Sequence, residues 1–132
     1  MQIEIGRRLY TLTFGFDALD YLDKVYTQTE PQSGLEFGVG LRLFIPYLMM
    51  RNITALRHAI KAGTSTEMSK PSNFEIEEFI AKKLEDNTEE EFFDEIIDAL
   101  KKQPLTKKRA TEMVSAVEKE MVEVETAPPT ID

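Results

Sequence analysis

The chain has 132 residues, of which 42% are hydrophobic and 30% charged, and it contains no cysteine. This composition is typical of one folded domain, and it excludes disulfides and thiolate metal sites. The formal net charge is −8, and residues 75–98 alone carry eleven Asp and Glu against two Lys, which disfavours a nucleic-acid partner.

The first predicted element is a β-hairpin over about residues 2–13, with its turn at Gly6 and Arg7. The residues that alternate with polar ones are Ile3, Ile5, Leu9, Thr11 and Thr13. Asp17 can then cap a helix, because its side-chain oxygen can accept a backbone N–H bond. The apolar residues of that helix are Leu19, Leu22, Val25 and Tyr26. Pro31 and Gly34 predict a break after it.

The segment Leu35 to Met50 is apolar on nearly every side of a helix. Such a segment is buried in the core, in an oligomer interface or against a partner. Its uniformly apolar character predicts self-association into a homo-oligomer. Gly40, Arg42 and Pro46 interrupt it, so it is too short to span a membrane, and no signal peptide precedes it.

The second half of the chain contains clear helix boundaries. Asn52 caps a short helix that Gly63 ends, with Ile53, Leu56 and Ile60 on its apolar face. Capping boxes at Ser72–Glu75 and Thr88–Glu91 predict two further helices, the second of which Pro104 stops. Thr106 starts a long helix whose thin apolar stripe comprises Ala110, Met113, Val117, Met121 and Val124.

These elements predict an α+β fold that is mostly α. A small N-terminal β-hairpin is followed by about five or six amphipathic helices. A single domain is expected over residues 1–125, and residues 126–132, with Pro128 and Pro129, are expected to form a disordered tail.

The search for catalytic chemistry finds no plausible set of residues. His58 is the only histidine, so nucleophile–base triads and zinc sites have too few ligands. Gly38 and Gly40 lack the rest of a phosphate-binding motif. The carboxylates lie opposite the predicted apolar faces, where water screens them. We therefore predict a protein that is not an enzyme, with no cofactor, no metal, no bound nucleic acid and no membrane partner.

What remains is a surface for protein contact. Methionine adapts to irregular partners, and a thin apolar stripe favours helix-on-helix docking over deep burial. The residues predicted to contact a partner or a second copy are Leu41, Phe44, Tyr47, Leu48, Met49, Met113, Val117 and Met121.

The order of the elements resembles the tail assembly chaperones of long-tailed phages that infect Gram-positive bacteria. The likeness covers about residues 2–124 and rests on order and spacing rather than on a diagnostic motif. The segments that carry it include Tyr10–Phe14, Leu19–Tyr26, the glycine-punctuated apolar segment, Asn52–Ile60, Ile76–Ile80, Phe92–Pro104 and Leu105–Arg109.

The resemblance implies a chaperone that works in the host cytoplasm and is absent from the finished virion. It would coat the tape measure protein, a long helical chain with exposed apolar stripes, until tail-tube subunits displace it. It also implies a longer form made by ribosomal frameshifting, for which Pro128–Pro129 is a candidate junction. Two alternatives stay open: an acidic DNA mimic that inhibits a host DNA-binding protein, and a minor structural tail protein.

Overall fold

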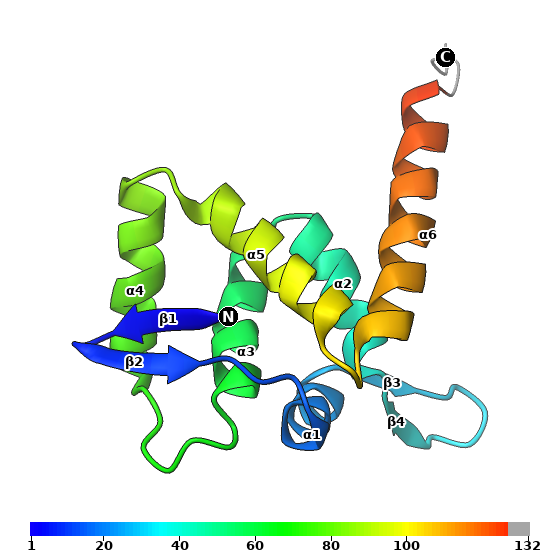
Figure 1. The fold of residues 1–132 in the computed structure, drawn as a ribbon. Coiled ribbons are helices and arrows are strands. Elements are labelled where there is room, and N and C mark those ends of the chain that lie inside the picture. The colour runs from blue at the N-terminus through cyan, green and yellow to red at the C-terminus, as the bar shows by residue number, and fades with distance from the viewer. Residues whose placement is uncertain (127–132) are drawn as a thin grey trace.

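The computed structural model describes residues 1–126, including all their side chains except those of residues 36, 37 and 123–126. Two small antiparallel hairpins and six helices make up this part of the chain (Figure 1). In chain order the elements are β1 (Gln2–Ile5), β2 (Arg8–Thr11), α1 (Phe16–Val25), β3 (Thr27–Thr29), β4 (Glu36–Gly38), α2 (Gly40–Met49), α3 (Ile53–Gly63), α4 (Asn73–Glu85), α5 (Glu89–Lys102) and α6 (Lys107–Thr126). The predicted fold class, α+β and mostly α, is confirmed.

The predicted N-terminal hairpin is confirmed, although its inward-facing residues differ on the second strand. Gly6 and Arg7 both have positive φ angles, 57° and 68°, as the tight turn of a two-residue hairpin requires. Ile3 pairs with Tyr10, and residues directly opposite each other share a face of the hairpin. Tyr10 is therefore buried, and Leu9 is 62% exposed on the outer face.

A second hairpin, β3–β4, was not predicted: β3 and the turn lie at the predicted break, and β4 lies at the start of the segment that was predicted to be apolar, Leu35 to Met50. Thr27 pairs with Gly38, and Thr29 pairs with Glu36. The polar strand β3 is exposed along its whole length, so it carries none of the apolar alternation by which strands are recognised. This hairpin extends away from the helices on the same side of the molecule as α6 (Figure 1).

Helices α1 and α2 approach each other closely because residue 40 is glycine. A Cβ at this position would lie 2.9 Å from the Leu22 Cβ and 2.7 Å from an Asp23 carboxylate oxygen. The same carboxylate accepts a hydrogen bond of 2.8 Å from the Gly40 N–H. The prediction that Asp17 caps α1 is wrong, because Gly15 is the N-cap and Asp17 lies in the first turn, where its charge favours the helix dipole.

The start of α3 agrees with the prediction, and its end differs slightly. The Asn52 side chain accepts a hydrogen bond of 3.2 Å from the Ala55 N–H. Gly63 is the last residue of the helix rather than the residue after it. It is packed against Leu12, whose Cβ would lie 2.9 Å from a Cβ at residue 63, and its carbonyl accepts a bond from the Thr13 N–H.

Of the two predicted capping boxes, one is confirmed and one is wrong. The Ser72 hydroxyl accepts from the Glu75 N–H at 3.1 Å, and the Glu75 carboxylate accepts from the Ser72 N–H at 3.0 Å. The Thr88 side chain makes no cap hydrogen bond to α5. Its hydroxyl instead donates to the Lys83 carbonyl at the end of α4, because the connection between the two helices is short.

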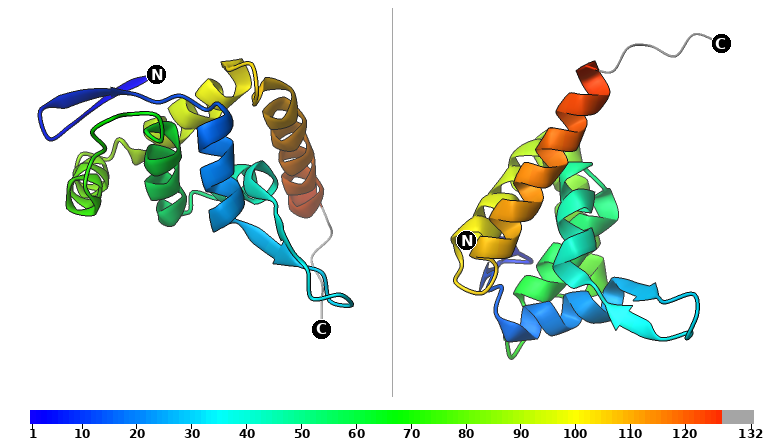
Figure 2. Two further views of the ribbon diagram at one scale, coloured as in Figure 1. Left: turned by 90° about the horizontal axis from the view of Figure 1, so that it is seen from below. Right: turned by 90° about the vertical axis from the view of Figure 1, so that its right-hand side faces the viewer.

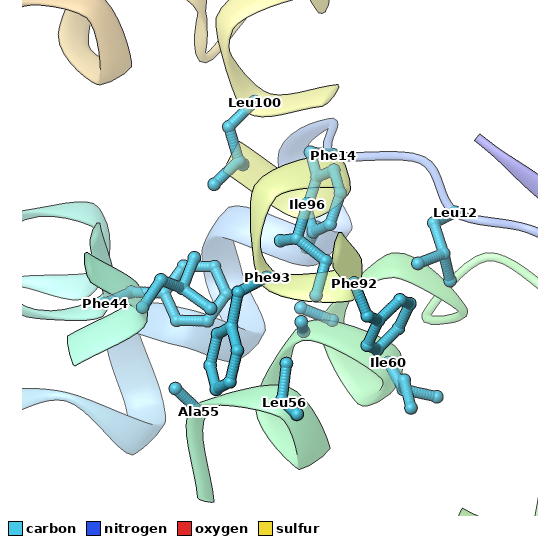
Figure 3. Close-up of a cluster of buried hydrophobic side chains, with 14 of the residues drawn as sticks. Leu12, Phe14, Phe44, Ala55, Leu56, Ile60, Phe92, Phe93, Ile96 and Leu100 are labelled. Carbon is cyan, nitrogen blue, oxygen red and sulfur yellow. The ribbon is translucent and has the colours of Figure 1, made fainter. Parts of the chain in front are cut away.

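The core lies where α2, α3 and α5 meet beneath the N-terminal segment. Figure 3 shows buried side chains from these elements, among them Phe44 of α2, Leu56 and Ile60 of α3, Phe92 and Phe93 of α5, and Leu12 of the N-terminal segment. The four largest fully buried side chains are Phe14, Phe44, Phe92 and Phe93. Burial of aromatic rings on this scale dominates the stability of a small domain.

Helix α6 has 20 residues, and its C-terminal half extends beyond the other elements (Figures 1 and 2). None of the helices within residues 1–126 is both long and apolar enough to cross a membrane. The tail predicted after residue 125, including Pro128 and Pro129, lies outside the described residues apart from its first residue, Thr126.

Candidate functional site

His58 makes its contacts within the protomer. The Tyr21 hydroxyl and His58 Nδ1 are 2.9 Å apart, and the Tyr26 ring meets the imidazole edge-on at 5.6 Å. Burial lowers the pKa of His58, and the charges of Arg57 and Lys61 lower it further. Among the described residues no group of three or more His, Cys, Asp or Glu side chains is arranged to hold a metal ion.

The residues predicted on the apolar segment fall into two groups on α2. Phe44 and Leu48 are fully buried, so they belong to the core of the protomer and not to a surface that a partner can reach. Leu41, Tyr47 and Met49 are partly buried and pack against that core. Phe44, Ile45 and Leu48 thus lie in the core of their own domain, whereas Leu35 and Met50, at the two ends of the segment, are 60% and 59% exposed.

The residues predicted on the last helix follow a gradient along α6. Ala110 near its start is 1% exposed, and Met113 and Val117 are partly buried. Val114, which was not among the predicted residues, is 4% exposed. Met121, two turns further on, is 45% exposed. The stripe is thus covered where α2 and α5 flank it and uncovered towards the C-terminus.

Two of the predicted residues, Met49 and Met121, line one groove between the end of α2, α5 and α6. The groove has a volume of about 530 Å³, and its apolar lining is completed by Ile97 and Val114. The charged residues around it are Arg51, Asp94, Asp98, Lys101 and Glu118. We refer to it as the α5–α6 groove. Its lining thus combines four apolar side chains with five charged ones, and such a mixed surface can take both the apolar stripe and the polar border of an amphipathic helix.

Arg51 fixes one wall of the α5–α6 groove. Its guanidinium lies 2.8 Å from the Glu90 carboxylate and 2.7 Å from that of Asp94, and it stacks over Phe93 at 5.3 Å. These contacts join the corner between α2 and α3 to α5. The φ angle of Arg51 is positive, 59°, so the corner is held in a conformation that side chains disfavour.

Sequence reasoning missed the contribution of α5 to this site. Ile97 lines the groove and directly follows Ile96, which is fully buried. Two consecutive isoleucines make the apolar face of α5 wider than packing against one neighbouring helix requires. This width was the feature of the sequence that could have predicted a contribution of α5 to the groove. Arg51 gave no signal, because its partners lie about 40 residues away in the chain.

The model of the phage tail assembly chaperone protein family, TAC, matches residues 2–115. The chain belongs to this family. No curated protein and no solved structure matches it. The matched residues of this tail assembly chaperone include Met49, Ile97 and Val114, whereas Met121, at the open end of the groove, lies beyond them.

Proposed function

We propose that this tail assembly chaperone binds apolar helical segments of the phage tape measure protein in the α5–α6 groove and keeps that protein soluble. The observation that carries the proposal is the groove itself. Met49 and Met121, from segments predicted independently to contact a partner, line one hollow together with Ile97 and Val114. Methionine side chains adapt to ligands of varying shape, which suits a long partner with many different helical segments.

The energetics of such a groove favour release as well as capture. Full burial of one aliphatic or methionine side chain contributes about 1.5–3 kcal/mol. Ordering side chains at an interface costs about 0.5–1.5 kcal/mol each, and association itself costs more. A groove with four apolar side chains therefore binds one helix weakly. Many copies along one long chain bind it firmly together, yet each copy can be displaced in turn.

The acidic surface supports the same role. Residues 75–98 span α4 and most of α5, and they carry a net charge of −9 from eleven acids and two lysines. Their carboxylates are mostly exposed, and Asp94 is 63% exposed even though it pairs with Arg51. A chaperone with this charge would keep a coated apolar chain apart from other coated chains.

We further propose the setting in which the chaperone works. The phage is long-tailed and infects a Gram-positive host, and the chaperone acts in the host cytoplasm and leaves before the virion is complete. It acts without catalysis, cofactor, nucleic acid or membrane. Western blotting of purified virions should detect no copy of the chain, and its presence there would favour a structural tail protein instead.

We also propose that the chaperone self-associates. The surface through which copies meet differs from the predicted one, because the apolar residues of α2 are largely covered by the rest of the same chain. Phe16 and Phe74 are 71% and 68% exposed, and such large apolar side chains are candidates for contact between copies. Light scattering at high concentration should show oligomers that Phe16→Glu or Phe74→Glu weakens. A wild-type protein that is strictly monomeric would contradict the proposal.

The decisive experiment is co-expression with the tape measure protein of the same phage. The chaperone should raise the soluble fraction of the tape measure protein and co-purify with it, and the complex should persist in about 0.5 M salt, where the Debye length is about 4–5 Å. Met121→Glu should abolish co-purification, because a carboxylate then replaces one of the four apolar side chains that line the groove.

Leu105→Glu is a matched control. Leu105 is 46% exposed, almost the same as Met121 at 45%, and it lies outside the α5–α6 groove. This variant should co-purify with the tape measure protein as the wild type does. If the tape measure protein is equally soluble without the chaperone, the proposed function is wrong.

A further inference from the structure

A second groove lies between α3 and α4, remote from the first. Helices α4 and α6 are at opposite ends of the molecule in two views (Figures 1 and 2). This α3–α4 groove has a volume of about 500 Å³. None of the residues that line it lines the α5–α6 groove. The α3–α4 groove is therefore a hollow separate from the α5–α6 groove.

The α3–α4 groove has an apolar floor and an apolar rim. Ile76 and Ile80 of α4 form the floor and are 1% and 7% exposed. Ile53 of α3 and Leu84 of α4 border it and are 41% and 40% exposed. Exposed aliphatic side chains on both walls leave an apolar strip that a helix face can cover.

The charge of this groove is concentrated on α3. Arg57 and Lys61 are one helical turn apart, and among residues 1–126 neither forms an ion pair with a carboxylate. Both charges act on His58, on the same helix, by lowering its pKa. Glu77, on the α4 side, is the acid in the lining. The α3 wall thus presents two cations that have no carboxylate partner.

The α5–α6 groove has the opposite polarity. Asp94, Asp98 and Glu118 line it together with two cations, Arg51 and Lys101. Arg51 is already paired with Asp94 and Glu90. A helix with basic residues beside its apolar stripe suits that groove, whereas the α3 wall suits a helix with acidic residues there.

We propose that the α3–α4 groove is a second helix-binding site, and that it takes an amphipathic helix with Asp or Glu along the edge of its apolar stripe that faces Arg57 and Lys61. This inference rests on the proposed function, because its ligand is an apolar helical segment of the kind that the tape measure protein would supply. Two sites of opposite polarity let one chaperone hold two segments of a long chain. The second segment then binds at the high effective concentration that the first creates.

The test uses two designed helical peptides of about 18 residues, five turns of helix. They have the same apolar stripe, which is bordered by Glu in one peptide and by Lys in the other. The net charge of the protein, −8, attracts the Lys peptide in general. A preference for the Glu peptide therefore requires a local basic wall. Fluorescence anisotropy at about 0.15 M salt, where the Debye length is about 8 Å, measures both affinities at the intact protein.

The wild type should bind the Glu peptide at least tenfold more tightly at this groove than it binds the Lys peptide there. NMR shift mapping should place the Glu peptide at Ile53, Arg57 and Leu84. The double variant Arg57→Glu, Lys61→Glu should reverse the preference. Leu84→Ser should weaken the Glu peptide at least tenfold, and Leu105→Ser, which changes a side chain of similar exposure elsewhere, should leave its affinity unchanged.

Three outcomes would overturn the inference: equal affinity for the two peptides at this groove, mapping of the Glu peptide to other residues, or a chaperone oligomer that Leu84→Ser dissociates. The last would make a second copy the occupant. Met121→Glu should not change binding of the Glu peptide. A wild-type chaperone that binds the Glu peptide at this groove but does not capture the tape measure protein rejects the proposed function alone, and a wild type that captures the tape measure protein but does not bind the Glu peptide here rejects the second site alone.

Discussion

Helices α2 and α6 both carry residues that were predicted to contact a partner or a second copy, and the structure buries these residues to different extents. On α2, Phe44 and Leu48 are fully buried within the protomer. On α6, exposure rises from 4% at Val114 to 45% at Met121. A helix that is apolar on most sides is enclosed by its own domain, whereas a helix with one narrow stripe is covered only as far as its neighbours reach.

The lengths of the two helices explain the gradient. At 1.5 Å per residue, the 20 residues of α6 extend about 30 Å, and the 10 residues of α2 extend about 15 Å. The longer helix therefore extends past the helices against which it packs. Its C-terminal half continues past the body of the protein (Figure 2). The half of the stripe that the domain leaves uncovered is the half available to a partner.

The largest effect should come from the centre of α2. Phe44→Ala removes a fully buried ring from the core and should lower the free energy of unfolding by about 3–5 kcal/mol. Chemical denaturation monitored by circular dichroism measures the change. A decrease of the unfolding free energy by less than about 1 kcal/mol would mean that α2 is not enclosed by the domain. Phe44 would then again be a candidate for contact with a partner.

The covered half of α6 should show an intermediate effect. Val114→Ala removes two methyl groups from a side chain that is 4% exposed, and it should cost about 2 kcal/mol of unfolding free energy. The same denaturation experiment measures it. A neutral result would show that α6 is loosely attached along its whole length rather than only at its end.

The outer side of α2 can be tested through pH, because His58 lies with Tyr47 and Leu43 around one hollow there. The pKa of His58 is lower in the folded protein than its unfolded value of 6.5, since burial disfavours the charged form. The unfolded state thus binds a proton first as the pH falls below 6.5, and stability is lost from there down to the folded pKa.

The control for this pH effect is the variant His58→Gln, whose unfolding free energy is measured over the same pH range. Its unfolding free energy should fall less than that of the wild type between about pH 7.5 and pH 5. Because carboxylates contribute equally to both curves, the difference in slope reports His58. Parallel curves would show that this side of α2 is open to water.

The smallest effect on stability should come from the end of α6. Met121→Glu places a charge at a side chain that is 45% exposed, so the unfolding free energy should stay within about 0.5 kcal/mol of the wild type. The same variant should lose capture of the tape measure protein. A large loss of stability would mean that Met121 is part of the fold, and the comparison between the two helices would fail.

Local patterns determined much of this fold by themselves. The turn at Gly6 and Arg7 and the caps at Asn52 and Ser72 involve residues within a few positions of one another. Their hydrogen bonds can be inferred from spacing, because side chain and backbone are neighbours in the chain. The same reasoning failed at Thr88, where the end of α4 competed for the hydroxyl.

Only the tertiary structure decided which apolar residues face outward and which grooves exist. Met49 and Met121 meet across the α5–α6 groove although 72 positions separate their numbers. The α3–α4 groove depends on the distance between two helices, and Arg51 depends on carboxylates of α5. Periodicity states which side of a helix is apolar, but the cover over that side depends on where the other helices end.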